Sequence, residues 1–334
     1  MVVLHRLQVE HILSGSTDML ALISDKSAHG GPVEGALTRI KAEPNARSRI
    51  VSDSHQWEAP MSYAEILVAL GEDDAAYQRA SYAGMLAGQL GASLLGVLSR
   101  WPHPPDVEPN ATIGMVGELL AEARASCRLD LATVEAGFRA TVEPSVDQVF
   151  FAGGIGSMTE AVLREARRAD LIVIGRSTPS GDDDGFCDAQ VLLVRGGRPV
   201  LVVPPAYEAR ALPRHIAIAW RDCRASRRVV REALPLLRRA QQVSVVTLNE
   251  VLSATPASSA ADIVGFLQSH GVPARASGRS GAAPLRELLH ILDEDDADLL
   301  VAPAYCSNQL VCSELMRQTT RMLSRCRIPC LLST

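Results

Sequence analysis

The chain has 334 residues, a length that predicts about two domains. Apolar residues make up 47% and charged residues 21%, a composition that favours folded cores and excludes disorder for most of the chain. A formal net charge of −5 and an aromatic content of 4% argue against nucleic-acid binding. No stretch of about 18 apolar residues predicts a membrane span, and the opening segment MVVLHRLQVEHIL is too charged for a signal peptide. We therefore expect a cytoplasmic protein without a nucleic-acid or membrane partner.

Residues 1–60 differ in texture from the rest of the chain. Their apolar positions are irregular, and the run SDKSAHGGPVEG is interrupted by glycine, serine, proline and histidine. We predict a weakly structured N-terminal extension over 1–60, with one short helix near Ser16–Ser24.

From Met61 onward, short apolar runs alternate with helical patterns, which is typical of α/β proteins. Gly91 is expected to end the first helix, and Ser157 to cap a later one with Glu160 at the capping-box spacing. A loop or short helix should precede the last strand of this half. The predicted strands cover 65–70, 92–98, 148–153, 170–175 and 198–204, and the predicted helices cover 74–90, 115–138 and 157–168.

The second half repeats this pattern. The run HIAIAW matches EILVAL, DLLVAP matches DLIVIG, and IPCLLS matches RPVLVV, so a whole domain is duplicated. We predict one domain over 61–206 and a second over 213–334, joined near 207–213. The predicted strands cover 215–220, 243–248, 273–278, 298–303 and 328–333, and the predicted helices cover 224–239, 258–270, 284–293 and 310–325.

Strands separated by helices predict a doubly wound parallel sheet in each domain, with helices on both faces. In such sheets, ligands bind beyond the carboxyl ends of the strands where the strand order reverses, here after the first and fourth strands. The residues to inspect therefore follow 65–70 and 170–175 in the first half, and 215–220 and 298–303 in the second.

At these positions the sequence resembles the universal stress protein family, in its tandem two-domain bacterial form. The resemblance covers about residues 61–334 and rests on the motifs AEILVAL, ADLIVIGRS, RPVLVVPP, HIAIAW, ADLLVAPAY and IPCLLS. It implies five-stranded parallel sheets of order 3-2-1-4-5. It also implies that the domains pair through their last strands, so that a tandem chain packs as an intramolecular pseudo-dimer.

Family members that bind ATP carry an aspartate after the first strand and the pattern G-x2-G-x9-G, followed by Gly, Ser or Thr, after the fourth. Glycines are needed there because the phosphates approach backbone N–H groups closely. In the second half, the aspartate position falls on Arg221, and the glycine positions fall on Pro303, Cys306 and Met316, followed by Arg317. Pro303 has no N–H to donate, and Met316 adds bulk where a phosphate would lie.

The first half keeps Gly175 as the first glycine of the pattern, but Thr178 occupies the second. Gly181 and Gly185 could be displaced substitutes in a loop that is about two residues shorter than the family pattern. The run Asp182–Asp184 between them would repel a polyphosphate.

The adenine-side aspartate of the family falls on Gly71 in the first half. Asp73 and Asp74 follow closely and remain candidates for that role.

Other residue clusters have two interpretations each. The Asp182–Asp184 run could bind a divalent cation, although a solvated acidic loop is the commoner meaning. An arginine run at the start of the 224–239 helix could attract an anion, although arginines spaced i, i+4 usually form an exposed face; it consists of Arg221, Arg224, Arg227, Arg228 and Arg231. The seven cysteines lack a C-x-x-C motif and are expected to be reduced and mostly buried, with Cys306 as a candidate reactive thiol.

Our leading hypothesis is a non-catalytic stress-response or regulatory module whose nucleotide sites are degenerate in both halves. It is expected to need no cofactor or metal, to act on a regulatory protein partner, and to be capable of forming a homodimer. The alternative is an ATP-binding stress protein with slow hydrolase or switch behaviour. That alternative would use the loop Gly175–Asp188 and a metal held by its aspartates.

Overall fold

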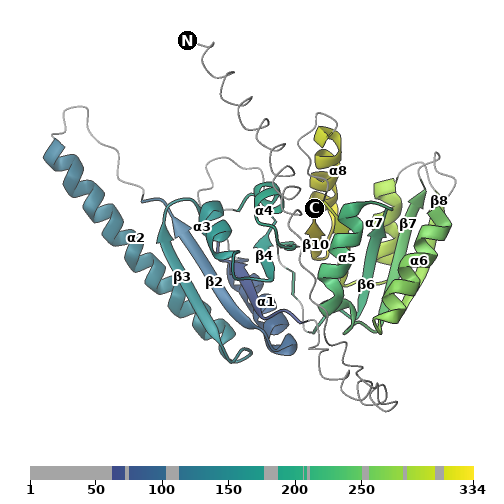
Figure 1. Cartoon of the computed structure of the whole chain (residues 1–334). Coiled ribbons are helices and arrows are strands. Elements are labelled where there is room, and N and C mark those ends of the chain that lie inside the picture. The colour runs from purple at the N-terminus through teal and green to yellow at the C-terminus, as the bar shows by residue number, and fades with distance from the viewer. Residues whose placement is uncertain are drawn as a thin grey trace, which may run out of the picture. The chain divides into compact units, whose positions relative to one another are not determined.

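The protein is described from a computed structural model of the whole chain (Figure 1). The structure describes residues 62–71, 75–102, 113–176, 187–205, 207–208, 211–249, 256–280, 284–304 and 312–334. The predicted N-terminal extension, with its short helix near Ser16–Ser24, lies outside the described residues. We refer below to residues 61–206 as the first repeat and to residues 213–334 as the second repeat.

Each repeat contains five strands alternating with four helices within the described residues. The first repeat consists of β1 (Glu65–Ala69), α1 (Ala76–Leu90), β2 (Ser93–Arg100), α2 (Ile113–Val142), β3 (Val149–Ile155), α3 (Met158–Glu165), β4 (Leu171–Gly175), α4 (Ala189–Arg195) and β5 (Val200–Val203). The second repeat consists of β6 (His215–Trp220), α5 (Arg224–Leu237), β7 (Gln242–Asn249), α6 (Pro256–Ser269), β8 (Ala274–Ser280), α7 (Pro284–Glu294), β9 (Leu299–Pro303), α8 (Cys312–Arg325) and β10 (Cys330–Ser333).

The described strands form one ten-stranded sheet in the order β3-β2-β1-β4-β5-β10-β9-β6-β7-β8. Each repeat therefore has the order 3-2-1-4-5 that the family resemblance implies. All pairs within a repeat are parallel, whereas β5 and β10 pair antiparallel, with Leu201 opposite Leu331. The predicted pairing through the last strands is confirmed. Because the repeats share one sheet, the boundaries 61–206 and 213–334 as separate domains stay a prediction.

Both faces of the sheet are covered by helices (Figure 1). The core on one face is made with α1, α2, α5 and α6, and the core on the other with α3, α4, α7 and α8. The central strands β1, β4, β5, β9 and β10 are almost entirely buried, which explains why they read as unbroken apolar runs. The predicted α/β architecture is confirmed.

Local signals for helix ends are borne out with small shifts. Gly91 adopts the left-handed conformation, with φ of 69°, that closes α1. The Ser157 hydroxyl accepts from the Glu160 backbone N–H and caps α3, while the Glu160 carboxylate accepts from Arg195 at 2.6 Å. The helix predicted over 157–168 ends at Glu165 and continues as a turn over 166–168.

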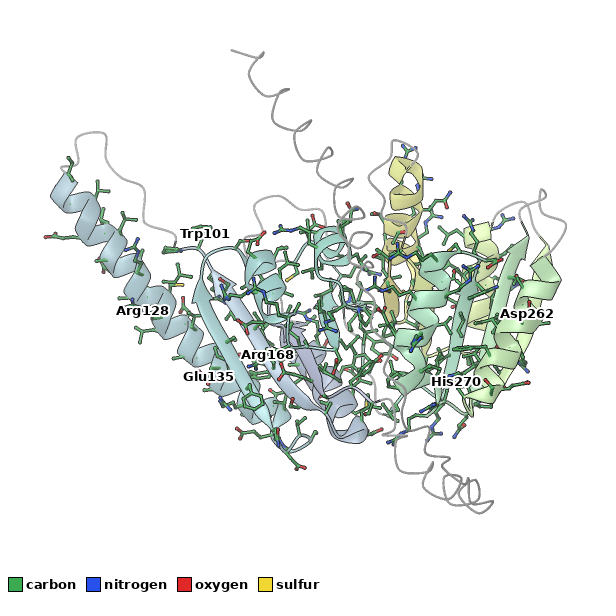
Figure 2. All side chains as sticks on the ribbon, in the orientation of Figure 1. Trp101, Arg128, Glu135, Arg168, Asp262 and His270 are labelled. Atoms are coloured by element: carbon green, nitrogen blue, oxygen red, sulfur yellow. The ribbon has the colours of Figure 1, made fainter. Side chains whose placement is uncertain are left out.

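The helix α2 is longer than the predicted 115–138. It begins at Ile113, ends at Val142 and contains 30 residues. Its described buried residues, Cys127, Phe138 and Val142, lie from the middle of the helix to its end. The first half extends beyond β2 and β3, and its side chains project away from the sheet (Figure 2). Ile113 is 94% exposed and Leu129 is 72% exposed. Among the described residues, no helix has the length and apolar character needed to cross a membrane.

The aspartate in each ADL motif has the same structural role in both repeats. The Asp170 carboxylate accepts hydrogen bonds from the backbone N–H groups of Ala64 at 2.7 Å and Glu65 at 3.3 Å. Asp298 does the same for Arg214 at 2.8 Å and His215 at 2.9 Å. Each aspartate thus ties the start of the fourth strand of its repeat to the start of the first.

Arg176, which follows β4 directly, connects the first repeat to the second. Its guanidinium donates to the backbone carbonyls of Leu323 at 3.0 Å and Cys326 at 2.9 Å, at the C-terminal end of α8. These carbonyls have no partners within their own helix and carry the negative end of the helix dipole. On the other face, the Tyr63 hydroxyl donates to the Glu232 carbonyl of α5 at 2.7 Å.

Replacing Arg176 with methionine should lower the free energy of unfolding by about 2 kcal/mol, because two charge-assisted hydrogen bonds are lost while most of the aliphatic stem is kept. Urea denaturation followed by circular dichroism measures this difference. Arg128→Met is the matched control, because Arg128 is exposed on α2 (Figure 2) and should change stability by less than about 0.5 kcal/mol. Equal effects of the two substitutions would contradict a stabilising role of Arg176 at the junction.

Candidate functional site

The crevice predicted at the carboxyl ends of β1 and β4 contains a buried arginine. Val68 of β1 lies opposite Val173 of β4, so Gly71 and Gly175 follow at the same edge of the sheet. Arg79 of α1 reaches this edge, and only 4% of its surface is exposed. Its Nε donates to the Ala69 carbonyl at 3.0 Å.

The Arg79 guanidinium lies against the Gly175 backbone. A Cβ atom built at Gly175 would clash with Nη1 of Arg79 and would lie 3.0 Å from its Cζ. The glycine therefore makes room for a side chain of the protein itself. The resemblance implies a phosphate near this glycine, and the described residues place the cationic Arg79 side chain there.

Two residues at the described end of the Gly175–Asp188 loop, Cys187 and Asp188, have structural surroundings. Cys187 is buried, and burial raises the pKa of its thiol to about 12, although the nearby Arg79 acts in the opposite direction. The Asp188 carboxylate accepts from the backbone N–H groups of Gln190 at 2.8 Å and Val191 at 3.2 Å, and so caps α4. Asp188 is therefore a capping residue.

The remaining first-repeat candidates, Asp73, Thr178 and Gly181, lie outside the described residues. The same holds for the acidic run Asp182–Asp184, whose two interpretations both stay predictions. In the part of the chain that the structure describes, no group of three or more His, Cys, Asp or Glu side chains could hold a metal ion.

In the second repeat, the candidate residues are spread along the carboxyl edge. Pro303 is buried as the last residue of β9 and pairs with Ser333 of β10. Arg221 follows β6 directly, Arg224 begins α5, and Arg317 lies in α8, all three exposed. Cys306 lies outside the described residues.

Part of the arginine run at the start of α5 is an exposed face, as predicted. Arg227 is exposed and forms an ion pair with Asp222. The half-buried Arg228 instead donates to Glu232 at 2.8 Å and to the Gly197 carbonyl of the first repeat at 3.1 Å. Anion binding at Arg221 and Arg224 stays a prediction.

Sequence reasoning missed Arg79, although a signal was present. Arg79 precedes Tyr82, Ala83 and Leu86 by three, four and seven positions, and all three are buried on the face of α1 that packs on the sheet. A charged residue at that spacing belongs to the apolar stripe of the helix, where it needs a specific partner. The Ala69 carbonyl, at the carboxyl end of β1, is such a partner.

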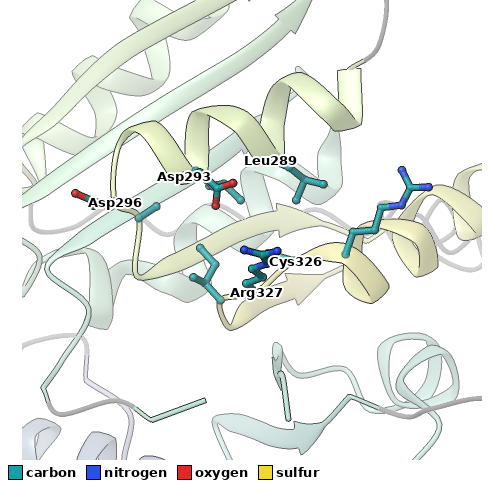
Figure 3. Close-up of a pocket in the computed structure, with 9 residues that line it drawn as sticks. Leu289, Asp293, Asp296, Cys326 and Arg327 are labelled. Atoms are coloured by element: carbon teal, nitrogen blue, oxygen red, sulfur yellow. The ribbon is translucent and has the colours of Figure 1, made fainter. Parts of the chain in front are cut away.

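Two cavities lie at the opposite edge of the sheet, where the chain enters the fourth and fifth strands of each repeat. The first-repeat cavity, of about 630 Å³, lies between the ends of α3 and α4 and is lined by Glu160, Leu163, Arg164, Ala166, Arg167, Arg195, Gly196, Gly197 and Arg198. The second-repeat cavity, of about 370 Å³, lies between the ends of α7 and α8 (Figure 3) and is lined by Leu289, Leu292, Asp293, Asp296, Ala297, Arg325, Cys326, Arg327 and Ile328. Duplication has thus placed a cavity at equivalent positions in both repeats.

A comparison with protein-family models finds no match, and neither does a comparison with curated proteins. Solved structures do match. The crystal structure of a universal stress protein from Archaeoglobus fulgidus covers 81% of this chain and 96% of its own, with a TM-score of 0.53 and 11% identity. A functionally unknown protein from Pseudomonas aeruginosa covers 81% of this chain and 92% of its own, with a TM-score of 0.50 and 12% identity.

These likenesses show that the chain has the universal stress protein fold, as the strand motifs predict. A universal stress protein in complex with cAMP also matches, over 42% of this chain and 97% of its own, with 21% identity and a TM-score of 0.30. At that score, the match says nothing about ligand binding by this chain.

Proposed function

We propose that the protein is a tandem stress-response module of the universal stress protein type, regulatory and non-catalytic, with degenerate nucleotide sites in both repeats. The fold supports the stress-response assignment. The observation that carries the rest is the position of Arg79. Its buried guanidinium occupies the space above Gly175, which is the one position of the family's glycine pattern that the chain retains.

The second repeat supports the same proposal through Pro303. A proline at the end of β9 cannot donate a backbone N–H to a phosphate, and the residue is buried. The exposed Arg221, which follows β6, replaces the family's carboxylate with a charge of the opposite sign.

The alternative is an ATP-binding protein, with slow hydrolase or switch behaviour, in which Arg79 contacts a phosphate. One specific observation favours it, because a buried guanidinium at a switch-point crevice has the charge and the donors that suit a phosphate. The two proposals make opposite predictions for one substitution. In the first, Arg79 fills the crevice, whereas in the second it binds the ligand.

The test is isothermal titration of the full chain with ATP and Mg²⁺, and separately with cAMP, using the native protein and the Arg79→Ala variant. We expect no saturable binding to the native protein up to about 1 mM nucleotide, because Arg79 fills the crevice. A Kd above about 1 mM corresponds to less than about 4 kcal/mol of binding free energy. Arg79→Ala should bind nucleotide no more weakly than the native protein.

Stoichiometric binding to the native protein that falls by at least about tenfold in Arg79→Ala, the loss expected for one charge-assisted contact, would establish the alternative instead. Arg128→Ala is the matched control, since it removes an exposed arginine of another helix in the same repeat. Circular dichroism of each variant checks that the fold is retained, and Arg79→Lys keeps the charge if Arg79→Ala is unstable.

The proposed partner is a regulatory protein. The proposed packing of the repeats is a pseudo-dimer, which the antiparallel pairing of β5 with β10 supports. The helix α2 supports an interaction role, because it extends past the sheet at its start and exposes Ile113 and Leu129. A homodimer through this helix would appear in light scattering as a doubled mass that Leu129→Glu removes. A monomeric mass for the native protein would exclude self-association through this helix.

A further inference from the structure

The second-repeat cavity is lined by one cysteine, Cys326. Cys326 follows α8 directly, and although only 2% of its surface is exposed, it lines the cavity together with Asp293 and Arg327 (Figure 3). The volume of about 370 Å³ is ample for a small solute such as a peroxide. A solute of that size can therefore occupy the cavity beside Cys326.

Cys326 has a second thiol beside it. The Cys330 side chain, at the start of β10, interacts with the Cys326 side chain, is itself buried, and donates its S–H to the Ile328 carbonyl at 3.5 Å. The hydrogen bond from Cys330 is the largest factor that lowers the pKa of Cys326, and burial opposes it. A backbone hydrogen bond at Ile328 and the positive charge of Arg176 lower this pKa further, while Asp293 raises it.

Neither sulfur is needed for packing in this fold, because the first repeat does without both. Aligning RPV of the first repeat with IPC of the second places Cys330 on Val200 and Cys326 on Gly196. Val200 is buried in β5 as Cys330 is in β10. Two thiols in contact, one at a cavity wall, therefore distinguish the second repeat from its copy.

We propose that Cys326 and Cys330 form a dithiol that hydrogen peroxide or an organic hydroperoxide oxidises to a disulfide. The Cys326 thiolate attacks the peroxide oxygen, which becomes a sulfenic acid on sulfur while the other oxygen leaves as water or alcohol. The Cys330 thiol then attacks the Cys326 sulfur, and its proton leaves with the displaced hydroxyl as water. The two thiols lose two electrons to the peroxide, which is reduced to two molecules of water, or to one of water and one of alcohol.

The disulfide would form where the two repeats meet. Cys330 lies opposite Val202 of β5 and Leu300 of β9, and the Cys326 carbonyl accepts from Arg176 of the first repeat. Closing a sulfur–sulfur bond requires the two side chains to approach from hydrogen-bonding distance to about 2.05 Å. The bond would therefore pull on the first residue of β10 and couple oxidation to the junction of the repeats.

The test is brief treatment of the native full chain with a small excess of hydrogen peroxide, followed by alkylation of the remaining thiols, trypsin digestion and mass spectrometry. Trypsin cleaves after Arg325 and Arg327, so Cys326 is released in the dipeptide CR and Cys330 in IPCLLST. Only a disulfide holds these two peptides together. We expect the linked pair to appear before any other cysteine is oxidised.

Two variants separate the steps. Cys330→Val installs the residue that the first repeat carries, and it should leave a sulfenic acid on Cys326 that dimedone traps. Cys326→Ser should slow the loss of thiols by about tenfold or more, because it removes the attacking sulfur. Cys127→Ser is the control, since Cys127 is a buried thiol of α2, and it should leave the linked pair unchanged.

Recovery of Cys326 and Cys330 in alkylated form after other cysteines have been oxidised would overturn the proposal. So would a disulfide that joins either residue to a different cysteine. Dimedone labelling of Cys330 in place of Cys326 would reverse the assigned roles and would overturn the mechanism.

Discussion

Replacing Asp298 with alanine should lower the free energy of unfolding by about 3 kcal/mol, because its carboxylate accepts two backbone N–H groups that would lose their partner. Asp298→Asn keeps one acceptor oxygen and should cost about half as much. Urea denaturation followed by circular dichroism measures both variants. Asp262→Ala removes an exposed carboxylate of α6 (Figure 2) and should change stability by less than about 0.5 kcal/mol.

The equivalent substitution Asp170→Ala tests whether the repeats unfold together. Asp170 has the same pair of backbone partners in the first repeat and should cost a similar amount. Because β5 and β10 join both repeats in one sheet, we expect one transition that both variants shift, and roughly additive losses in the double variant. Two transitions, of which each variant shifts only one, would show instead that 61–206 and 213–334 unfold independently.

Gly88→Ala should lower the free energy of unfolding by about 3 kcal/mol or more, at least as much as Asp298→Ala. A Cβ at Gly88 of α1 would overlap the backbone carbonyl oxygen of Ser145, in the turn that follows α2. Backbone atoms cannot rotate away as a side chain can, so α1 or the turn must shift. The same helix carries Arg79, so the shift should also disturb the candidate crevice.

Gly117→Ala is the matched control for this prediction. Gly117 lies within α2, and a Cβ there meets no atom within 4 Å. Alanine is a better helix former than glycine, so this variant should gain up to about 1 kcal/mol. Thermal unfolding that shows Gly88→Ala to be as stable as Gly117→Ala would contradict the close packing of α1 against the turn.

The strands could be predicted closely because each central strand is buried on both faces and must be apolar throughout. The strand predicted over 215–220 is confirmed as β6 (His215–Trp220), and the other predicted strands differ from the observed ones only near their ends. The helix predicted over 115–138 falls short of α2 by two residues at its start and by four at its end, because the residue pattern fixes where a helix lies more closely than where it ends.

The position of the candidate site could be predicted from the sequence, but the residues that line it could not. The reversal of strand order locates the crevice, but the chain that lines it comes from α1 as well as from the strand ends. Arg79 follows Gly71 by eight positions and reaches Gly175 only because β1 and β4 are neighbours. Likewise, the sequence predicts Cys326 and Cys330 as buried small residues. Only the folded chain shows that their side chains interact and that Cys326 lines a cavity.

By itself, the sequence determined the duplication, the α/β class and the departures from the family's glycine pattern, such as Thr178 and Pro303, because these depend on residue types at fixed spacings along the chain. The tertiary structure alone decided that the Arg79 guanidinium lies against Gly175 and that Cys326, beside Cys330, lines the second-repeat cavity. These features depend on side chains that are far apart in sequence or turned toward one another by the fold. Local pattern carries no information about which distant side chain will occupy the space above a glycine.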